Sequence, residues 1–162
     1  MLADFAITVL RERCAGALMW CLMDTNYDAT RMKWGLWRFR DEKWEPRPGF
    51  YAWSLITRYT ELGSTVHRLA SDSPSVVAVA FRAPSKGSWT LMAVNRSDSA
   101  RPLTVSGLPA GSRWQEFVYS EKTVPTPDRE MIPSSATPAA DADGVVVRSL
   151  PPRSFALWHE AR

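Results

Sequence analysis

The strongest constraint on this chain is a run of seven apolar residues at 17–23, Ala-Leu-Met-Trp-Cys-Leu-Met, bounded by Gly16 and Asp24. The run is too short for most helices, and it contains no polar position that would mark a side facing solvent. An unbroken apolar run of this length is typical of a strand buried on both faces, as in parallel sheets flanked by helices. We therefore predict a buried strand over 17–23.

Helical patterns flank this predicted strand on both sides. Apolar residues at helical spacing predict a helix over 2–14, with Gly16 just beyond its end. A second helix is predicted to begin at the Pro-Arg-Pro-Gly of 46–49 and to close at Gly63. Its apolar stripe is Ala52, Leu55, Ile56, Tyr59 and Leu62. Helix, strand, long loop and helix is the order found around a (β/α) barrel or a doubly wound sheet.

The composition changes near residue 70, which indicates two units. Ten of the 12 prolines lie beyond this point, whereas five of the eight tryptophans lie between Trp20 and Trp53. Short apolar stretches separated by turn residues then predict an antiparallel sandwich. Its predicted strands are 75–82, 89–95, 103–106, 113–119, 145–150 and 154–159, with 125–143 as a surface excursion. The predicted units are residues 1–66 and residues 67–162.

Charge and motif content exclude several functions. The net charge of +3 comes from basic residues scattered along the chain, so we expect no nucleic-acid partner. No run of about 18 apolar residues and no basic leader occurs, so we expect no membrane partner and no signal peptide; the localisation stays open. The sequence has no phosphate-binding glycine loop, and we expect no cofactor. Cys14 and Cys21 cannot form a four-ligand zinc site.

Calcium binding is considered and set aside. The stretch from Asp24 to Asp28 opens like an EF-hand loop, but Ala29 replaces the required glycine and Gly35 replaces the bidentate glutamate. We therefore expect no metal. Two interpretations of these polar residues stay open: a strand exit stabilised by Asx turns, or one side of a pocket at the carboxyl end of the strand.

Tryptophans near the predicted strand are candidate sugar contacts. A flat indole packs well against the apolar face of a sugar ring, and Trp20, Trp34, Trp37 and Trp44 lie at the strand or in the loop that follows it. The alternative is that these rings are core residues. The sequence leaves Trp20 open between the two, and favours a core position for Trp44 and for Trp53.

Three stretches together resemble a known family. They are Met-Trp-Cys-Leu-Met-Asp at 19–24, Trp-Gly-Leu-Trp at 34–37 and Pro-Arg-Pro-Gly-Phe-Tyr-Ala-Trp at 46–53. They resemble the last strand and last helix of clan A glycoside hydrolases, the (β/α)8 retaining glycosidases. Residues 70–162 resemble the small β-sandwich that closes such chains. The fold class that this implies is an α/β fragment, the end of a (β/α)8 barrel, followed by an all-β antiparallel sandwich.

The resemblance also implies a sugar-binding subsite. In the family, the tryptophan of the eighth strand floors the subsite at the cleavage point, and Trp20 is the residue that matches it. Its neighbours by position complete the predicted substrate-binding set, which is Trp20, Asp24, Asn26, Tyr27 and Trp34. The carbohydrate is therefore expected to bind through a parent enzyme.

The catalytic pair of the family has no counterpart in this chain. Retaining enzymes use two carboxyl groups about 5 Å apart, and in this family they are glutamates that follow strands four and seven of the barrel. None of the glutamates here follows a recognisable barrel strand; they are Glu12, Glu42, Glu45, Glu61, Glu116, Glu121, Glu130 and Glu160. The resemblance places both catalytic residues before Met1. We expect this chain alone to be inactive and its partner to be the missing N-terminal barrel segment.

A single apolar strand without neighbours is expected to be poorly ordered or to associate. Without parallel neighbours its backbone and side chains are exposed unless it pairs elsewhere. We therefore expect the sandwich to fold alone and residues 1–45 to be poorly ordered or to cause association.

Two other functions compete with the glycosidase interpretation. One is a non-catalytic carbohydrate-binding module, and the other is an interaction domain without a sugar role. A binding module should expose aromatic rings on its sandwich. Trp89, Trp114 and Trp158 lie in apolar strands and are expected in the core, which favours the glycosidase fragment.

Overall fold

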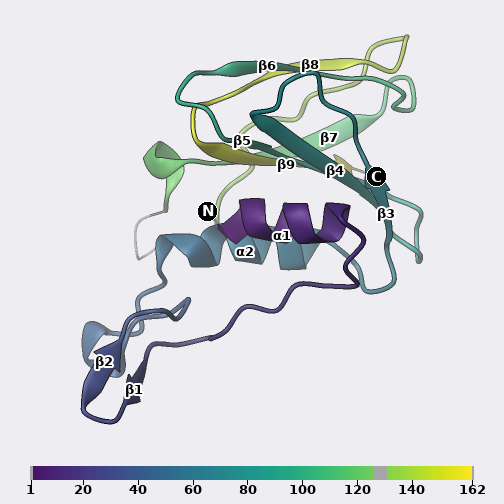
Figure 1. Cartoon of the computed structure of the whole chain (residues 1–162). Coiled ribbons are helices and arrows are strands. Elements are labelled where there is room, and N and C mark those ends of the chain that lie inside the picture. The colour runs from purple at the N-terminus through teal and green to yellow at the C-terminus, as the bar shows by residue number, and fades with distance from the viewer. Residues whose placement is uncertain (1, 126–130, 162) are drawn as a thin grey trace.

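The computed structural model describes residues 2–125 and 131–161, and in this part of the chain it forms three layers (Figure 1). Helices α1 (Leu2–Arg11) and α2 (Pro48–Tyr59) lie side by side on one face of an antiparallel sheet. A small second sheet covers the other face. None of the described helices is long and apolar enough to cross a membrane.

The central sheet has the strand order β3-β4-β5-β9-β7, and the second sheet pairs β6 with β8. The strands of these sheets are β3 (Thr65–Arg68), β4 (Val76–Arg82), β5 (Trp89–Asn95), β6 (Arg101–Val105), β7 (Arg113–Tyr119), β8 (Val146–Leu150) and β9 (Ser154–Ala161). The six strands predicted for the sandwich all form, each within two residues of its expected bounds. The surface excursion predicted over 125–143 includes residues 126–130, which lie outside the described residues. Strand β3 was not predicted, because it is a short and mostly exposed edge strand without an apolar alternation.

The central sheet is apolar on both faces, and alternate residues of β4 show how. Val77, Val79 and Phe81 face the helices, where they share one cluster with Ala6, Ile7, Leu55 and Ile56. Val76, Ala78 and Ala80 face the second sheet, where they pack with Trp114, Leu150 and Trp158. The period of two along a strand puts neighbours on opposite sides, so one strand supplies both clusters.

Helix α1 is part of the same core as the sheet. Its Ala3, Ala6 and Ile7 have at most 1% of their surface exposed, and small alanines allow close approach of the two backbones. Residues 1–45 were expected to be poorly ordered or to cause association beside a sandwich that folds alone. The expected disorder is wrong for α1, because its apolar stripe is buried against the sheet and α2.

The predicted strand over 17–23 does not form. These residues run as an extended segment below the helices (Figure 1), and Leu18, Trp20 and Leu22 are exposed at 84%, 75% and 63%. The physical reason is that burial on both faces requires neighbouring parallel strands. The described residues supply only one parallel bridge, at Met23.

Both helices end earlier than predicted. Helix α1 closes with the amides of Arg13 and Cys14 donating to the carbonyls of Leu10 and Val9, both at 3.1 Å. This is a Schellman arrangement, in which the left-handed position, here φ 69°, falls on Arg13 instead of Gly16. Helix α2 stops at Tyr59 because Thr60 is extended. Leu62, predicted in its stripe, is 98% exposed.

A buried ion pair crosses the second core. The side chain of Glu116 on β7 is only 4% exposed and pairs with Arg148 on β8. It also accepts hydrogen bonds from Trp158 Nε1 at 2.9 Å and from Ser135 Oγ at 3.3 Å. Burial opposes ionisation of Glu116, but the bonds from Arg148 and Trp158 and the charge of Arg148 hold its pKa below the ordinary value.

Replacing Arg13 with glycine should stabilise the protein. A side chain with a Cβ is strained in the left-handed region, and glycine removes about 1 kcal/mol of that strain. We expect Arg13→Gly to raise the free energy of unfolding in urea by this amount. Arg13→Ala is the matched control, since it removes the same charge but keeps the Cβ. An equal gain in both variants would contradict the explanation.

Removing the charge of Glu116 should make stability less dependent on pH. Because folding lowers the pKa of Glu116, its contribution is complete above the unfolded pKa and is lost as the pH falls through the folded pKa. We expect Glu116→Gln to cost about 1–3 kcal/mol at pH 7 and much less at pH 3. Urea unfolding across this pH range measures the difference. Asp98→Asn is the control. Asp98 pairs with Arg153 at 2.6 Å on the exposed surface, so this pair should contribute little to stability.

Candidate functional site

Three extended segments form a small unit below the helices. Residues 21–24 run parallel to residues 35–37, with the amide of Asp24 donating to Trp37 O at 2.8 Å and the amide of Trp37 donating to Leu22 O at 3.0 Å. Residues 45–47 run antiparallel on the other side, where the amide of Arg47 donates to Leu36 O at 2.8 Å. We call residues 21–24, 35–38 and 45–47 the three-segment unit.

The close contact in this unit requires a glycine at position 35. A Cβ at Gly35 would overlap the backbone of Met23 and Asp24. These backbone atoms cannot move away as a flexible side chain could, so only glycine lets the two segments approach each other this closely. The glycine of the Trp-Gly-Leu-Trp stretch therefore has a packing role.

Asp24 holds the unit together from inside. Its side chain has no exposed surface; it accepts a hydrogen bond from the Gly35 amide at 2.8 Å and forms an ion pair with Arg47. Burial opposes its ionisation, but the hydrogen bonds from Arg47 and Gly35 and the charges of Arg47 and Lys33 keep its pKa below the ordinary value. Arg47 is also the N-cap residue of α2, so this pair ties the unit to the helix layer.

A hairpin extends from the unit, formed by β1 (Thr25–Tyr27) and β2 (Thr30–Met32). Arg31 on β2 binds both oxygens of Asp41, at 2.7 and 3.0 Å, and lies 4.0 Å above the centre of the Phe39 ring. It also contacts Glu42 at 3.1 Å, and this acidic pair belongs to the 3-10 turn Arg40–Glu42. These contacts hold the hairpin against the turn.

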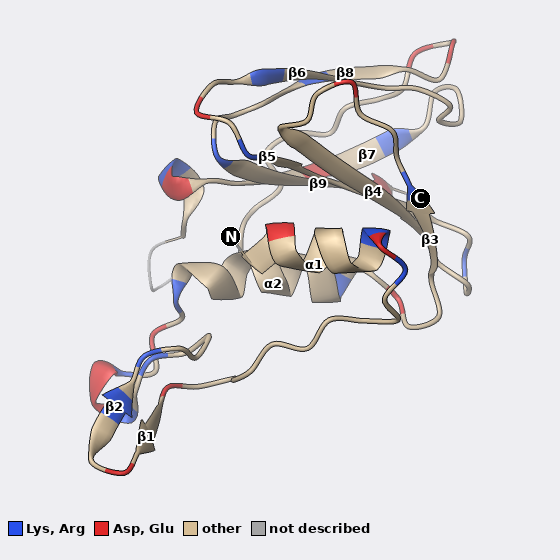
Figure 2. Cartoon of the chain, viewed as in Figure 1, with Lys and Arg blue, Asp and Glu red and all other residues tan. Residues whose placement is uncertain are grey.

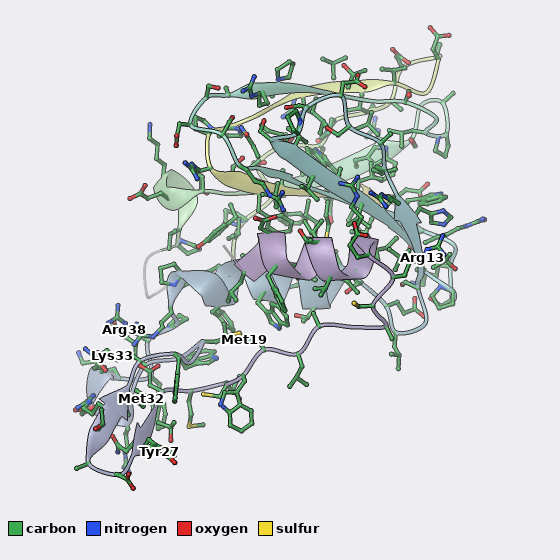
Figure 3. The ribbon with its side chains drawn as sticks, viewed as in Figure 1. Arg13, Met19, Tyr27, Met32, Lys33 and Arg38 are labelled. Atoms are coloured by element: carbon green, nitrogen blue, oxygen red, sulfur yellow. The ribbon has the colours of Figure 1, made fainter. Side chains whose placement is uncertain are left out.

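The predicted aromatic contacts are on the surface of this region. Trp20, Tyr27 and Trp34 are exposed at 75%, 70% and 45%, and the peptide bond after Trp20 is cis. Figure 3 places Tyr27 at the far end of the hairpin from Lys33. Within the described residues no ring contact joins the three aromatic side chains, so each is exposed separately.

The other tryptophans of the loop are placed differently. Trp37 packs edge-on against Phe50, with ring centres 4.7 Å apart, and Trp53 packs on the helix core as expected. Trp44, favoured as a core residue, is 42% exposed and stands at a positive φ of 55°. Its position beside the turn that ends at Lys43 explains this exposure.

The structure divides the five predicted substrate-binding residues into two groups. Asp24 is buried and accepts a hydrogen bond from the Gly35 amide, next to Trp34. The other four residues are exposed: Trp20, Asn26, Tyr27 and Trp34. As sugar contacts the five residues remain a prediction. Sequence reasoning missed Arg47, although an aspartate that follows an apolar run signals the need for a buried cationic partner. In the described part of the chain, no three His, Cys, Asp or Glu side chains gather to hold a metal ion.

Comparison with known proteins identifies the fold. No family model and no curated protein matches the chain. A GH30 endoxylanase from Clostridium papyrosolvens C71 matches 72% of this chain with 28% of its own, at a TM-score of 0.58 and 15% identity. A GH30 subfamily 8 xylanase from Clostridium acetobutylicum matches 80% of this chain with 31% of its own, at a TM-score of 0.63 and 17% identity. An α-L-arabinofuranosidase from Thermotoga maritima matches 78% of this chain with 32% of its own, at a TM-score of 0.57 and 14% identity.

These similar structures are clan A glycoside hydrolases, each matched over part of its chain. The present chain spans less than a third of the length of the three enzymes above. At identities of 14–17%, the similarity establishes a shared fold. The chain therefore has the fold of one part of a clan A glycoside hydrolase.

Replacing Gly35 with alanine should separate the three-segment unit without unfolding the sheet. The added Cβ overlaps backbone at 23–24, so we expect faster hydrogen exchange at the amides of Asp24, Leu36 and Trp37. Amides of β5 and β9 should keep their protection. Gly16→Ala is the control, because nothing lies within 4 Å of a Cβ there. Unchanged exchange in Gly35→Ala would contradict the assigned packing.

Proposed function

We propose that this chain is the C-terminal portion of a glycoside hydrolase. In this proposal residues 1–66 are the end of a (β/α)8 barrel and residues 67–162 are its accessory β-sandwich. The portion supplies aromatic side chains to a sugar-binding subsite and supplies neither catalytic glutamate. One observation carries the proposal: a chain that shares its fold with part of several glycoside hydrolases leaves Trp20, Tyr27 and Trp34 exposed to solvent.

Exposed aromatic rings suit a carbohydrate ligand. An indole presents a flat apolar face that covers the C–H face of a sugar, and its N–H is free to bond a hydroxyl group. Apolar rings that face water lose the favourable free energy of burial, and a ligand that covers them would recover it. Asp24 has an indirect role, because its side chain accepts a hydrogen bond from the Gly35 amide and so fixes the backbone next to Trp34.

Two described carboxylates of this region, Asp24 and Asp41, are unsuited to acid catalysis. A retaining glycosidase requires two carboxyl groups about 5–5.5 Å apart, one of them with a raised pKa. Asp24 has a lowered pKa and is covered by Arg47, and Asp41 is held by Arg31, which also lowers its pKa. These observations support a role in which the bond-breaking groups come from another part of the enzyme.

The position of the sheet tryptophans argues against a carbohydrate-binding module. Trp114 and Trp158 are exposed at only 1% and 4%, and Trp89 packs against His67 with ring centres 4.9 Å apart. In the described strands of the central and second sheets, no aromatic side chain is among the exposed large apolar residues. The expectation that these rings are core is confirmed for Trp114 and Trp158. A binding module without aromatic rings on its sheets has no platform for a polysaccharide.

Sugar binding and the lack of turnover are measurable on the chain itself. We expect weak binding of xylo- and arabino-oligosaccharides, seen as a change in tryptophan fluorescence, and no hydrolysis of aryl xylosides or arabinofuranosides. Trp20→Ala should weaken binding about 3–10-fold, the usual contribution of one stacked ring. Trp44→Ala is the matched control, because Trp44 is also exposed but lies outside the proposed subsite. Turnover by the pure chain, or binding that is indifferent to Trp20, would overturn the proposal.

A further inference from the structure

A cavity of about 490 Å³ opens where the C-terminal end of α1 meets the edge strand β3. Three arginines line it: Arg11 and Arg13 at the end of α1, and Arg68 on β3. Figure 2 shows basic residues at this end of the helix, close to β3. We call Arg11, Arg13 and Arg68 the arginine cluster. Residues that are far apart in the sequence thus line one cavity.

The register of β3 places Arg68 on the side of the sheet where α1 ends. In the antiparallel pair of β3 and β4, Val66 lies opposite Phe81 and Arg68 lies opposite Val79. Phe81 and Val79 belong to the core that the helices cover. Side chains of directly opposite residues lie on the same face of a sheet, so Arg68 is on the helix face.

The charges around this cavity are unequal. Among the described residues that line it, Glu12 is the only acidic one. Its Oε1 lies 3.8 Å from a terminal nitrogen of Arg68, and both side chains are more than half exposed, so this pair is weak. The C-terminal end of a helix adds roughly half a negative charge. Together, Glu12 and the helix end offset about half of the positive charge of the arginine cluster.

The hydrogen bonds at the end of α1 do not require the arginine side chains. The amides of Arg13 and Cys14 already donate to the last carbonyls of the helix, as described above. Arg11 Nε is buried and, within the described residues, has no hydrogen-bond partner. A buried N–H group without an acceptor is unfavourable, and an oxygen of a bound ligand would satisfy it.

We infer that the arginine cluster binds a dianionic phosphate group. A guanidinium presents a flat fork of N–H donors that binds two oxygens of such a group at once, and the bonds are strengthened by the opposite charges. The positive charge that Glu12 and the helix end leave uncompensated favours two negative charges over one. The cavity has the volume of a site for a small organic ligand, so it has room for a phosphate group that is free or carried by a larger molecule.

This site is separate from the proposed sugar subsite. Figure 3 places Arg13 far from Tyr27 and Lys33 of the hairpin region. None of the five predicted substrate-binding residues lines the cavity. The inference goes beyond the proposed function and does not depend on it, since sugar binding through Trp20 and phosphate binding through Arg68 are measured by different variants.

A titration of the isotope-labelled chain with inorganic phosphate, followed by NMR at constant ionic strength, tests the site. We expect saturable shifts confined to the amides of residues 11–14 and 66–68. Arg68→Gln should weaken binding about tenfold, because it removes a charge and a donor fork. Arg113→Gln is the matched control, since Arg113 is an exposed arginine on β7, the opposite edge strand of the same sheet. Shifts that do not saturate, or equal weakening by both variants, would overturn the inference.

Two other ligands identify the chemistry of the bound group. Acetate should bind at least about tenfold more weakly than phosphate at about pH 8, where phosphate is mainly a dianion. Acetate that binds as tightly as phosphate would count against a dianion site. Glycerol phosphate distinguishes the two sources of the group. Tighter binding than that of inorganic phosphate assigns a phosphate carried by a larger molecule, and equal or weaker binding assigns the free ion.

The thiol of Cys14 gives an independent measurement. Cys14 is exposed and lines the cavity, whereas Cys21, the second free cysteine, does not line it. Bound phosphate should slow the alkylation of Cys14 by iodoacetamide several-fold, because it covers the thiol and disfavours the thiolate. Cys21 is the internal control in the same sample, and mass spectrometry measures both. Unchanged alkylation of Cys14, or equal slowing at both thiols, would contradict binding in this cavity.

Discussion

The molecule depends on one central sheet that is apolar on both faces. In β4 and β5, alternate residues serve two cores, so the helix layer and the second sheet are each held by one side of the same strands. A sheet of this kind cannot be stable alone, because one face or the other would meet water. This explains why α1 and α2, which precede the sheet in the sequence, share a core with it.

The three-segment unit is stabilised by a different kind of interaction. It has few buried apolar side chains, and a buried carboxylate at Asp24 takes their place, satisfied by Arg47 and by the Gly35 amide. A buried charge of this kind specifies one arrangement, since each partner is needed to offset its desolvation. The central sheet and the unit are therefore held by different forces, apolar burial in one and directed polar contacts in the other.

Sequence patterns predicted the parts whose environment lies within the chain. Strands β4, β5, β7 and β9 formed where expected, since their apolar residues are buried by other residues of the same chain. The partner of Asp24 was missed because Arg47 lies 23 residues away, and spacing does not reveal which cation reaches a buried carboxylate. The left-handed position at Arg13 was missed because the nearest glycine is the usual indication of a helix end.

The failed strand at 17–23 is informative for the same reason. A continuous apolar pattern records the surroundings in which a segment functions, and here the described chain provides almost none of them. If these residues were adapted to solvent, polar side chains would occupy one face of the segment. The disagreement between an apolar sequence and an exposed structure therefore indicates surroundings that the described residues do not supply, and the exposed Trp20 lies in the middle of this segment.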